Sequence, residues 1–487
     1  MIMGKFFCER ALFSLTETAR MENRISFWLE DGMKIIILGA GKVGKALTQH
    51  LSDEDYDYDV VVIDLHAEKV EAIVNQYDAL GIVGNGATFD ILMEAGVEEA
   101  DIIIAVTESD ELNILACLMA KRMGAKNSIA RVRNPEYLKQ RSFMRDKLGL
   151  TMIINPELEA ANEIRRILLF PSAFKVDTFV SGKIELAEFR LRENARLIGV
   201  PLNRLYKVSR TNVLICAVRR GEELIIPDGN FVPEKGDRIH VMGQHRDLVR
   251  FCHDIDLFEQ KTKRVIVVGG GRIAFYLARQ LVEHGIQVKI IENNPTRCLE
   301  LSRKLPEVTI IESDGSDEEV LIEEGIECVD ALVSLTGLDE ENIVISLYGK
   351  QMRAKKTVAK VTRMNFMHVL DQLDIDSVIS PKNIIAGHIL RFVRAKNNKD
   401  DANGVRTLHR LVNDEVEALE FVVTPQTSFL NKKVSEVKLK NNVLIAAISR
   451  ERGFVIPKGD TEIRLKDHIV IITTDRKICS LNDLVRR

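Results

Sequence analysis

Two glycine-rich hexapeptides are the residues of this sequence best suited to chemistry. The first consists of Gly39, Ala40, Gly41, Lys42, Val43 and Gly44. It follows an apolar run and opens a helical pattern, a context in which the first glycine permits a tight turn and the second lets the backbone approach a pyrophosphate. The third glycine lets the helix pack closely on the sheet, and the helix N-terminus favours the anion. The alternative is a degenerate fold whose glycines serve packing alone.

An acidic residue stands where such a motif needs one. Asp64 ends the next apolar run, 20 residues after Gly44. A carboxylate at this position accepts hydrogen bonds from both ribose hydroxyls and repels a 2′-phosphate, so the first site is predicted to prefer NAD over NADP.

The second hexapeptide lies 230 positions after the first. It consists of Gly269, Gly270, Gly271, Arg272, Ile273 and Ala274, with Glu292 at the acidic position. Alanine fits the third place of the motif, and Arg272 stands where a phosphate would approach the helix. We expect a second site that binds with a different affinity or remains empty.

Other loops are expected to line the same two crevices, because ligands of open α/β sheets bind at the carboxyl ends of the strands. The residues at these positions are Asn85, Gly86, Thr107 and Arg131 in the first copy, and Asp314, Gly315, Thr336 and Lys360 in the second. The basic residue is either a phosphate contact or a solvated strand end, and both interpretations stay open. The acidic runs at 108–111 and 339–341 are interpreted as N-terminal helix caps favoured by the helix dipole, with a cation site as the minor alternative.

Catalytic and metal-binding patterns do not emerge from the sequence. No HExxH, GxSxG or paired-cysteine spacing occurs, and His66 beside the first acidic residue is interpreted as incidental. Hydride transfer needs a group that manages a proton near the nicotinamide, and no candidate stands out. We therefore predict no catalytic residue, no metal site and no enzyme activity.

Short apolar runs alternate with helical patterns in the two segments that carry the glycine motifs. In the first segment we expect strands at 34–38, 59–63, 79–83, 101–106, 128–132 and 151–154. Helices are expected at 110–123, 156–170 and 382–395. Alternating strands and helices predict an α/β fold with a doubly wound parallel sheet, Rossmann-like in each copy. The segments that follow are rich in short strands and tight turns, typical of small α+β domains.

The repeat extends beyond the glycine motifs, because NVLICAV at 212–218 returns as NVLIAAI at 442–448. The unit of duplication is therefore a pair of domains, A–B–A–B. We predict an N-terminal extension at 1–32, A domains at 33–155 and 262–380, crossover helices at 156–172 and 381–397, and B domains at 173–256 and 404–487. The extension is expected to be poorly ordered, and the B domains to bind a ligand or to dimerise.

The composition excludes several classes of protein. Lysine plus arginine is 68 and aspartate plus glutamate is 72, and the charges are interspersed, so no nucleic-acid footprint is indicated. Isolated cysteines indicate a reducing compartment, and no apolar run is long enough to cross a bilayer. A cytoplasmic protein is expected, whose membrane role, if any, comes through a partner.

Together MKIIILGAGKVG, the VVID that ends at Asp64, GNGA at 84–87, TESDELN at 107–113 and the A–B–A–B plan resemble the TrkA family of Trk potassium-uptake regulatory proteins, built from tandem RCK (KTN) modules. The resemblance implies a peripheral subunit on the inner face of the membrane that binds NAD(H), with ATP or ADP as competing ligands. It further implies assembly into a ring-like homo-oligomer on an integral-membrane potassium transporter. Nucleotide occupancy would then shift the population of two arrangements of the lobes.

Two alternatives remain from the sequence. One is an NAD-dependent oxidoreductase with tandem domains, and the other is a nucleotide sensor for a different partner.

Overall fold

The computed structural model describes residues 32–486 apart from several short gaps. The gaps are 54–57, 171, 174, 180–182, 222, 258–260, 363–372, 374, 398–406, 412–415, 441, 451–452, 476–477 and 479. The predicted extension at 1–32, apart from residue 32, and residues 398–406 after the second crossover helix lie outside the described residues. The chain divides into two compact units, one ending at Ile154 and one beginning at Asn155.

The first unit contains a six-stranded parallel sheet in the order β3-β2-β1-β4-β5-β6. Its strands are β1 (Met33–Leu38), β2 (Tyr58–Asp64), β3 (Leu80–Val83), β4 (Ile102–Ala105), β5 (Asn127–Arg131) and β6 (Met152–Ile154). Its helices are α2 (Lys42–Ser52), α3 (Ala67–Val74), α4 (Phe89–Glu94), α5 (Asp110–Met123), α6 (Pro135–Lys139) and α7 (Arg141–Asp146). The strand order reverses between β1 and β4, which makes the ends of these strands the ligand crevice of a doubly wound sheet.

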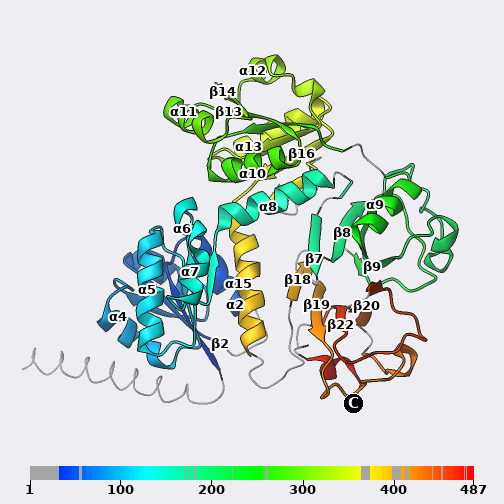
Figure 1. The fold of residues 1–487 in the computed structure, drawn as a ribbon, viewed down its shortest axis with the longest axis horizontal. Coiled ribbons are helices and arrows are strands. Elements are labelled where there is room, and N and C mark those ends of the chain that lie inside the picture. The colour runs from blue at the N-terminus through cyan, green and yellow to red at the C-terminus, as the bar shows by residue number, and fades with distance from the viewer. Residues whose placement is uncertain are drawn as a thin grey trace, which may run out of the picture. The chain divides into compact units, whose positions relative to one another are not determined.

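Apolar residues on both faces of the central strands explain this arrangement. Ile36 and Leu38 of β1 pack in one core with Ala116 and Ala120 of α5, whereas Ile37 points to the opposite face, toward α2. Strands that are buried on both faces need helices on both faces, and Figure 1 shows these helices around the sheet.

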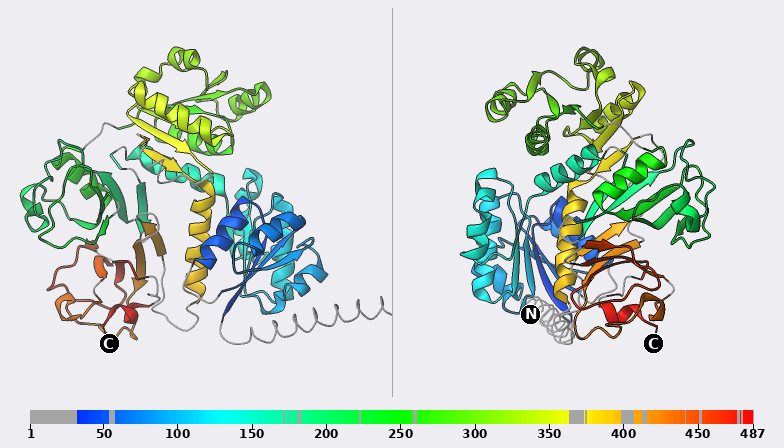
Figure 2. Two further views of the ribbon diagram at one scale, coloured as in Figure 1. Left: turned by 180° about the vertical axis from the view of Figure 1, so that it is seen from behind. Right: turned by 45° about the vertical axis from the view of Figure 1, so that its right-hand side comes forward.

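The second unit contains a sheet of the same order, β14-β13-β12-β15-β16-β17. Its strands are β12 (Arg264–Val268), β13 (Gln287–Glu292), β14 (Thr309–Glu312), β15 (Ala331–Ser334), β16 (Lys356–Lys360) and β17 (Ser377–Ile379). Its helices are α10 (Arg272–Glu283), α11 (Pro295–Lys304), α12 (Glu318–Glu323) and α13 (Asp339–Gln351). Figure 2 shows this domain from two further directions, with helices on either side of the sheet.

Each parallel-sheet domain is followed by a small five-stranded antiparallel domain, which we call B1 and B2. B1 has the order β10-β9-β11-β8-β7, and B2 has the order β18-β19-β22-β20-β21. The strands of B1 are β7 (Lys175–Phe179), β8 (Ile184–Arg190), β9 (Val213–Arg220), β10 (Glu223–Ile225) and β11 (Arg238–Gly243), with helix α9 (His245–Asp254). The strands of B2 are β18 (Thr407–Leu411), β19 (Val416–Val422), β20 (Val443–Arg450), β21 (Gly453–Val455) and β22 (His468–Thr473).

B1 and B2 share one hydrophobic core within the chain. Its buried residues from B1 are Phe179, Ile184, Leu186, Cys216 and Met242. Its buried residues from B2 are Val416, Ala418, Ala446, Ala447, Val470 and Ile472. The sequence left open whether the B domains dimerise or bind a ligand, and the structure pairs them with each other.

The crossover helices are α8 (Pro156–Leu169) and α15 (Pro381–Asn397). Ile164 and Ile167 of α8 and Ile385 and Ile389 of α15 are buried. Helix α8 also bonds to α10, since Nε2 of Gln280 donates to Oδ1 of Asn162 at 2.8 Å.

The predicted strands and helices agree with the structure to within one or two residues, and α5 spans the predicted 110–123. Four of the five cysteines in the described residues are buried, and Cys328 is exposed. Over the same residues, no helix combines the length and the apolar character that a membrane span requires.

Candidate functional site

The first glycine loop connects β1 to α2. Gly39 has φ +109°, a left-handed conformation suited to glycine, and its amide donates to the carbonyl of Ile63 at 2.8 Å. Gly41 caps the N-terminus of α2, and a Cβ added to it would meet no atom within 4 Å. A Cβ on Gly44 would lie 1.8 Å from the carbonyl oxygen of Gly39. Each glycine therefore occupies the position that the motif assigns to it: turn, open approach and close packing.

Lys42 and Val43 complete the first turn of α2. Lys42 is exposed, whereas Val43 is buried in the domain. Their backbone amides lie at the positive end of the helix, where an anion is favoured, whereas the amide of Ala40 is directed to Asp64.

Asp64 at the end of β2 reaches back to the glycine loop. Its Oδ2 accepts the amide of Ala40 at 2.7 Å, and its Oδ1 accepts the amide of His66 at 3.0 Å. An ionised carboxylate has about four acceptor positions, so two remain for hydroxyl donors. The acid thus aligns the loop and keeps capacity for a ribose.

Asn85 and Gly86 lie at the end of β3, beside the loop. Oδ1 of Asn85 accepts the amide of Ala87 at 3.1 Å. A Cβ on Gly86 would lie 2.0 Å from Cδ1 of Leu38. The side chain of Asn85 thus shapes its own turn, and Gly86 permits that turn to approach β1.

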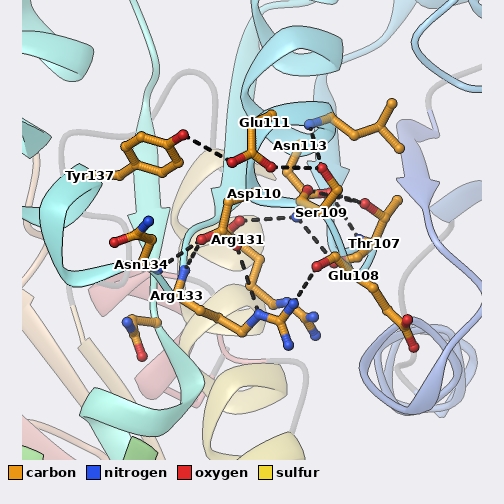
Figure 3. A network of polar contacts seen from close by, with 12 residues as sticks. Thr107, Glu108, Ser109, Asp110, Glu111, Asn113, Arg131, Arg133, Asn134 and Tyr137 are labelled. Atoms are coloured by element: carbon orange, nitrogen blue, oxygen red, sulfur yellow. Dashed lines mark hydrogen bonds and ion pairs between the residues drawn. The ribbon is translucent and has the colours of Figure 1, made fainter. Parts of the chain in front are cut away.

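Asn113 joins the ends of β4 and β5 and was missed by the sequence reasoning (Figure 3). Its Oδ1 accepts the amide of Thr107 at 2.9 Å and the hydroxyl of Thr107 at 2.7 Å. Its Nδ2 donates to the carbonyls of Thr107 at 3.2 Å and Arg131 at 3.0 Å. One buried amide therefore holds both predicted crevice residues. The DELN sequence that recurs as DEEN was the signal available for it.

Asp110 and Arg133 hold the neighbouring loop (Figure 3). Oδ2 of Asp110 accepts the amides of Arg133 at 2.8 Å and Asn134 at 2.7 Å. The guanidinium of Arg133 donates to the carbonyl of Glu108 and lies 3.7 Å from Oδ1 of Asp110. The side chain that caps α5 is Ser109, whose hydroxyl accepts the amide of Leu112 at 3.1 Å. The acidic run was predicted to cap α5, but the cap is a serine, and of the run only Asp110 and Glu111 lie in the first turn.

The second glycine loop has the same geometry with an additional arginine. Gly269 has φ +96°, and Gly271 caps α10 with no atom within 4 Å of an added Cβ. Oε2 of Glu292 accepts the amide of Gly270 at 2.7 Å, as Asp64 does for Ala40. Nε of Arg297 donates to the carbonyl of Gly270 at 2.8 Å, so Gly270 is held from both sides. The sequence reasoning did not single out Arg297.

Arg272 and Ile273 begin α10 directly after this loop. Arg272 is exposed at the helix start, and Ile273 is buried. Asp314 lies at the next loop of the crevice, where its Oδ1 accepts the amide of Ser316 at 2.9 Å and the hydroxyl of Ser316 at 2.8 Å. These hydrogen bonds lower the pKa of the Asp314 carboxyl, so that it stays ionised at neutral pH.

The remaining second-copy contacts follow the plan of the first copy. Asn342 accepts the amide of Thr336 at 2.8 Å and donates to the carbonyl of Lys360 at 3.0 Å. The ammonium of Lys360, at the position of Arg131, donates to the carbonyl of Thr336. That contact directs the second basic group onto its own crevice loop. In the described residues, no group of three or more His, Cys, Asp or Glu side chains could hold a metal ion.

The fold and the two sites together define a chain with tandem dinucleotide-binding-type domains, each followed by a small antiparallel domain. The TrkA-N domain model matches residues 35–156 and 265–381. The TrkA-C domain model matches residues 186–255 and 418–485.

Relatives of known name match over nearly the whole chain. The Trk system potassium uptake protein TrkA homolog of Archaeoglobus fulgidus is 33% identical over 454 residues, covering 93% of this chain and 100% of the relative. The Trk system potassium uptake protein TrkA of Haemophilus influenzae is 31% identical and covers 91% of this chain and 96% of the relative. The chain belongs to the TrkA family.

Solved structures agree with this fold. The GsuK channel bound to NAD superposes with a TM-score of 0.62 at 17% sequence identity, covering 97% of this chain and 83% of that chain. The GsuK RCK domain gives a TM-score of 0.60 and covers 92% and 93%. At this identity the likeness establishes the fold, which contains two Rossmann-like parallel-sheet domains.

Proposed function

We propose that this chain is a cytoplasmic regulatory subunit that binds NAD(H) at both glycine loops and controls potassium uptake by a membrane transporter. The observation that carries the proposal is the contact between acid and loop in each copy. Asp64 and Glu292 each accept a loop amide at 2.7 Å, while Gly41 and Gly271 leave the helix N-termini open. This is the arrangement that holds an adenosine diphosphate group.

The proposed ligand contacts follow from these positions. In the first copy residues 39–44 surround the pyrophosphate, with the amides at the start of α2 directed to it, and Asp64 accepts the ribose hydroxyls. Asn85, Gly86, Thr107 and Arg131 line the rest of the crevice. In the second copy residues 269–273, Glu292 and Asp314 take the same roles. ATP and ADP share the adenosine diphosphate group and therefore compete with NAD(H).

A calorimetric titration tests the sites directly. NAD, NADH, ATP and ADP are titrated into the wild type, Asp64→Asn and Glu292→Gln. Each variant should weaken binding at its own site, because loss of the carboxylate charge removes the strongest acceptor of the ribose. Glu98→Gln is a matched control, since Glu98 is exposed and precedes the amino end of β4, whereas the crevice lies at the carboxyl ends of the strands. If neither site variant weakens any nucleotide, the site assignment is wrong.

The regulatory role is supported by family membership and by the names of the relatives, which are potassium uptake proteins. We infer that the chain assembles into a ring-like homo-oligomer on the inner face of the membrane and changes the state of the transporter when nucleotide binds. Co-purification with the transporter subunit, with and without NADH, tests this inference. Size-exclusion chromatography with light scattering tests the assembly.

The oxidoreductase alternative makes a distinct prediction, because an enzyme would turn NAD over. Incubation of the purified chain with NAD and a panel of hydroxy acids should produce no NADH above the background rate. Sustained substrate-dependent formation of NADH would favour the enzyme.

A further inference from the structure

Three arginines stand side by side on one face of the B1 sheet. The strand register places Arg238 of β11 opposite Arg190 of β8 on one side and opposite Arg219 of β9 on the other. Because neighbouring strands lie about 4.8 Å apart, the three side chains leave the sheet within about 10 Å of one another. We call Arg190, Arg238 and Arg219 the arginine row.

Such a row carries an electrostatic cost. Like charges directly opposite each other in neighbouring strands destabilise a sheet. Glu188 offsets part of this charge, since its Oε1 lies 3.6 Å from Nη1 of Arg238, and Nε of Arg219 donates to the carbonyl of Gly221 at 3.1 Å. The next row toward the B2 contact holds Lys175, Glu188 and His240 in register. Burial lowers the pKa of His240, so this imidazole is neutral at pH 7 and neither adds to nor offsets the charge of the row.

The fold of a B domain does not require these arginines. B2 builds the same sheet, and its corresponding row consists of Val422, His468 and Ser449. The partner carboxylate is retained there, because Nδ1 of His468 lies 2.8 Å from Oε1 of Glu420. The arginine row is therefore a feature of B1 alone that the architecture tolerates but does not need.

The row lies on the rim of the contact between B1 and B2. Side chains two residues apart on a strand share a face, so Arg238, His240 and Met242 point the same way. Met242 belongs to the core that B1 shares with B2. Arg190 is exposed, and the side chain of Arg238 is 26% exposed, so the row is open to solvent. An anion reaching it would contact guanidinium groups beside an apolar interface.

We propose that the arginine row is a binding site for a small molecule carrying two adjacent phosphate groups. Guanidinium groups bind phosphate oxygens through two parallel hydrogen bonds, and three of them in a row match a diphosphate better than a single phosphate. This site is separate from both glycine loops. Its assignment depends on the strand register of B1 and does not depend on the proposed nucleotide function.

Inorganic pyrophosphate is the probe for this site. The full chain is titrated calorimetrically as wild type and as a triple variant, Arg190→Gln, Arg219→Gln and Arg238→Gln. A control triple variant carries Arg210→Gln, Arg246→Gln and Arg250→Gln, which removes the same charge from exposed positions of B1. The wild type and the control should bind one more pyrophosphate per chain than the row variant. Any binding at the glycine loops is common to all three proteins and cancels in the comparison.

Stability without ligand provides a second readout. Since the row is repulsive, the row variant should unfold at the same or a higher temperature than the wild type at low salt. A variant that fails to fold would contradict this expectation, and Arg190→Gln alone would then serve as the test, with about tenfold weaker pyrophosphate binding expected. Equal affinity and stoichiometry in wild type and row variants would overturn the proposal. NAD affinity should be unchanged by the row substitutions, so failure of the nucleotide sites remains distinguishable.

Discussion

The close contact between Gly44 and Gly39 makes a quantitative prediction for the first nucleotide site. A Cβ at position 44 would lie 1.8 Å from the carbonyl oxygen of Gly39 and 3.0 Å from its carbonyl carbon. An ordinary carbon–oxygen contact is longer by about 1.5 Å, so Gly44→Ala must displace the loop or the helix by roughly that distance. The loop has little room to move away from α2, because Gly39 already lies close to the backbone at Thr107. A Cβ added to Gly39 would lie 3.0 Å from the amide nitrogen of Thr107.

We therefore expect α2 to move away from the pyrophosphate position. Overpacking of this kind costs about 1–3 kcal/mol of stability. Loss of one charge-assisted hydrogen bond from a loop amide weakens nucleotide binding about tenfold or more. Thermal unfolding and calorimetric titration, the latter in a Glu292→Gln background, measure the two effects.

The second copy provides the control, because Ala274 occupies the matching position and is fully buried. Ala274→Gly should cost about 1 kcal/mol through helix propensity and leave binding at the first site unchanged. If Gly44→Ala unfolds at the wild-type temperature and binds nucleotide with the wild-type affinity, then the close approach does not constrain the site.

Three further substitutions test other parts of the structure. Asn113→Ala leaves buried backbone groups unpaired, so it should cost about 1–3 kcal/mol and weaken nucleotide at the first site in calorimetry. Arg394→Met removes the guanidinium whose Nη1 lies 2.7 Å from the fully buried carboxylate of Glu417, and it should lower the free energy of unfolding in urea by about 3–5 kcal/mol. A hydrogen bond to Glu185 raises the pKa of His245 above 6.5, so this pair stabilises B1 below that pH and the contribution fades as pH rises through the raised pKa. NMR titration of His245 should show the raised value and its return toward 6.5 in Glu185→Gln; an unchanged value would contradict the assignment.

Local pattern was enough to predict the parallel-sheet domains. Their strands are buried on both faces and read as continuous apolar runs, and α5 is bounded by Ser109 and Gly124, residues that favour helix ends. The turns of Gly39 and Gly269 need left-handed backbone, a requirement that the glycine spacing expresses directly.

Contacts between residues distant in sequence were beyond that reasoning. Asn113 reads as an ordinary polar residue of a helix until the fold brings the carbonyl of Arg131, 18 positions away, to within 3.0 Å of its amide. The buried pair of Arg394 and Glu417 joins a crossover helix to a strand of B2, and no periodicity indicates such a partner. The sequence identified the residues that determine backbone conformation, whereas the structure identified those that connect one loop to another through hydrogen bonds and ion pairs.

Joining B1 and B2 in one polypeptide has a consequence for how they can evolve. Two copies of one chain that associate through the same surface carry identical sequences on both halves, and every substitution appears twice. Here the linkage supplies a high local concentration of the matching half, so the two halves need not be equal. Arg238 and His468 occupy the same place in the two sheets with different chemistry. Covalent pairing has thus released each half to specialise while the common core keeps them together.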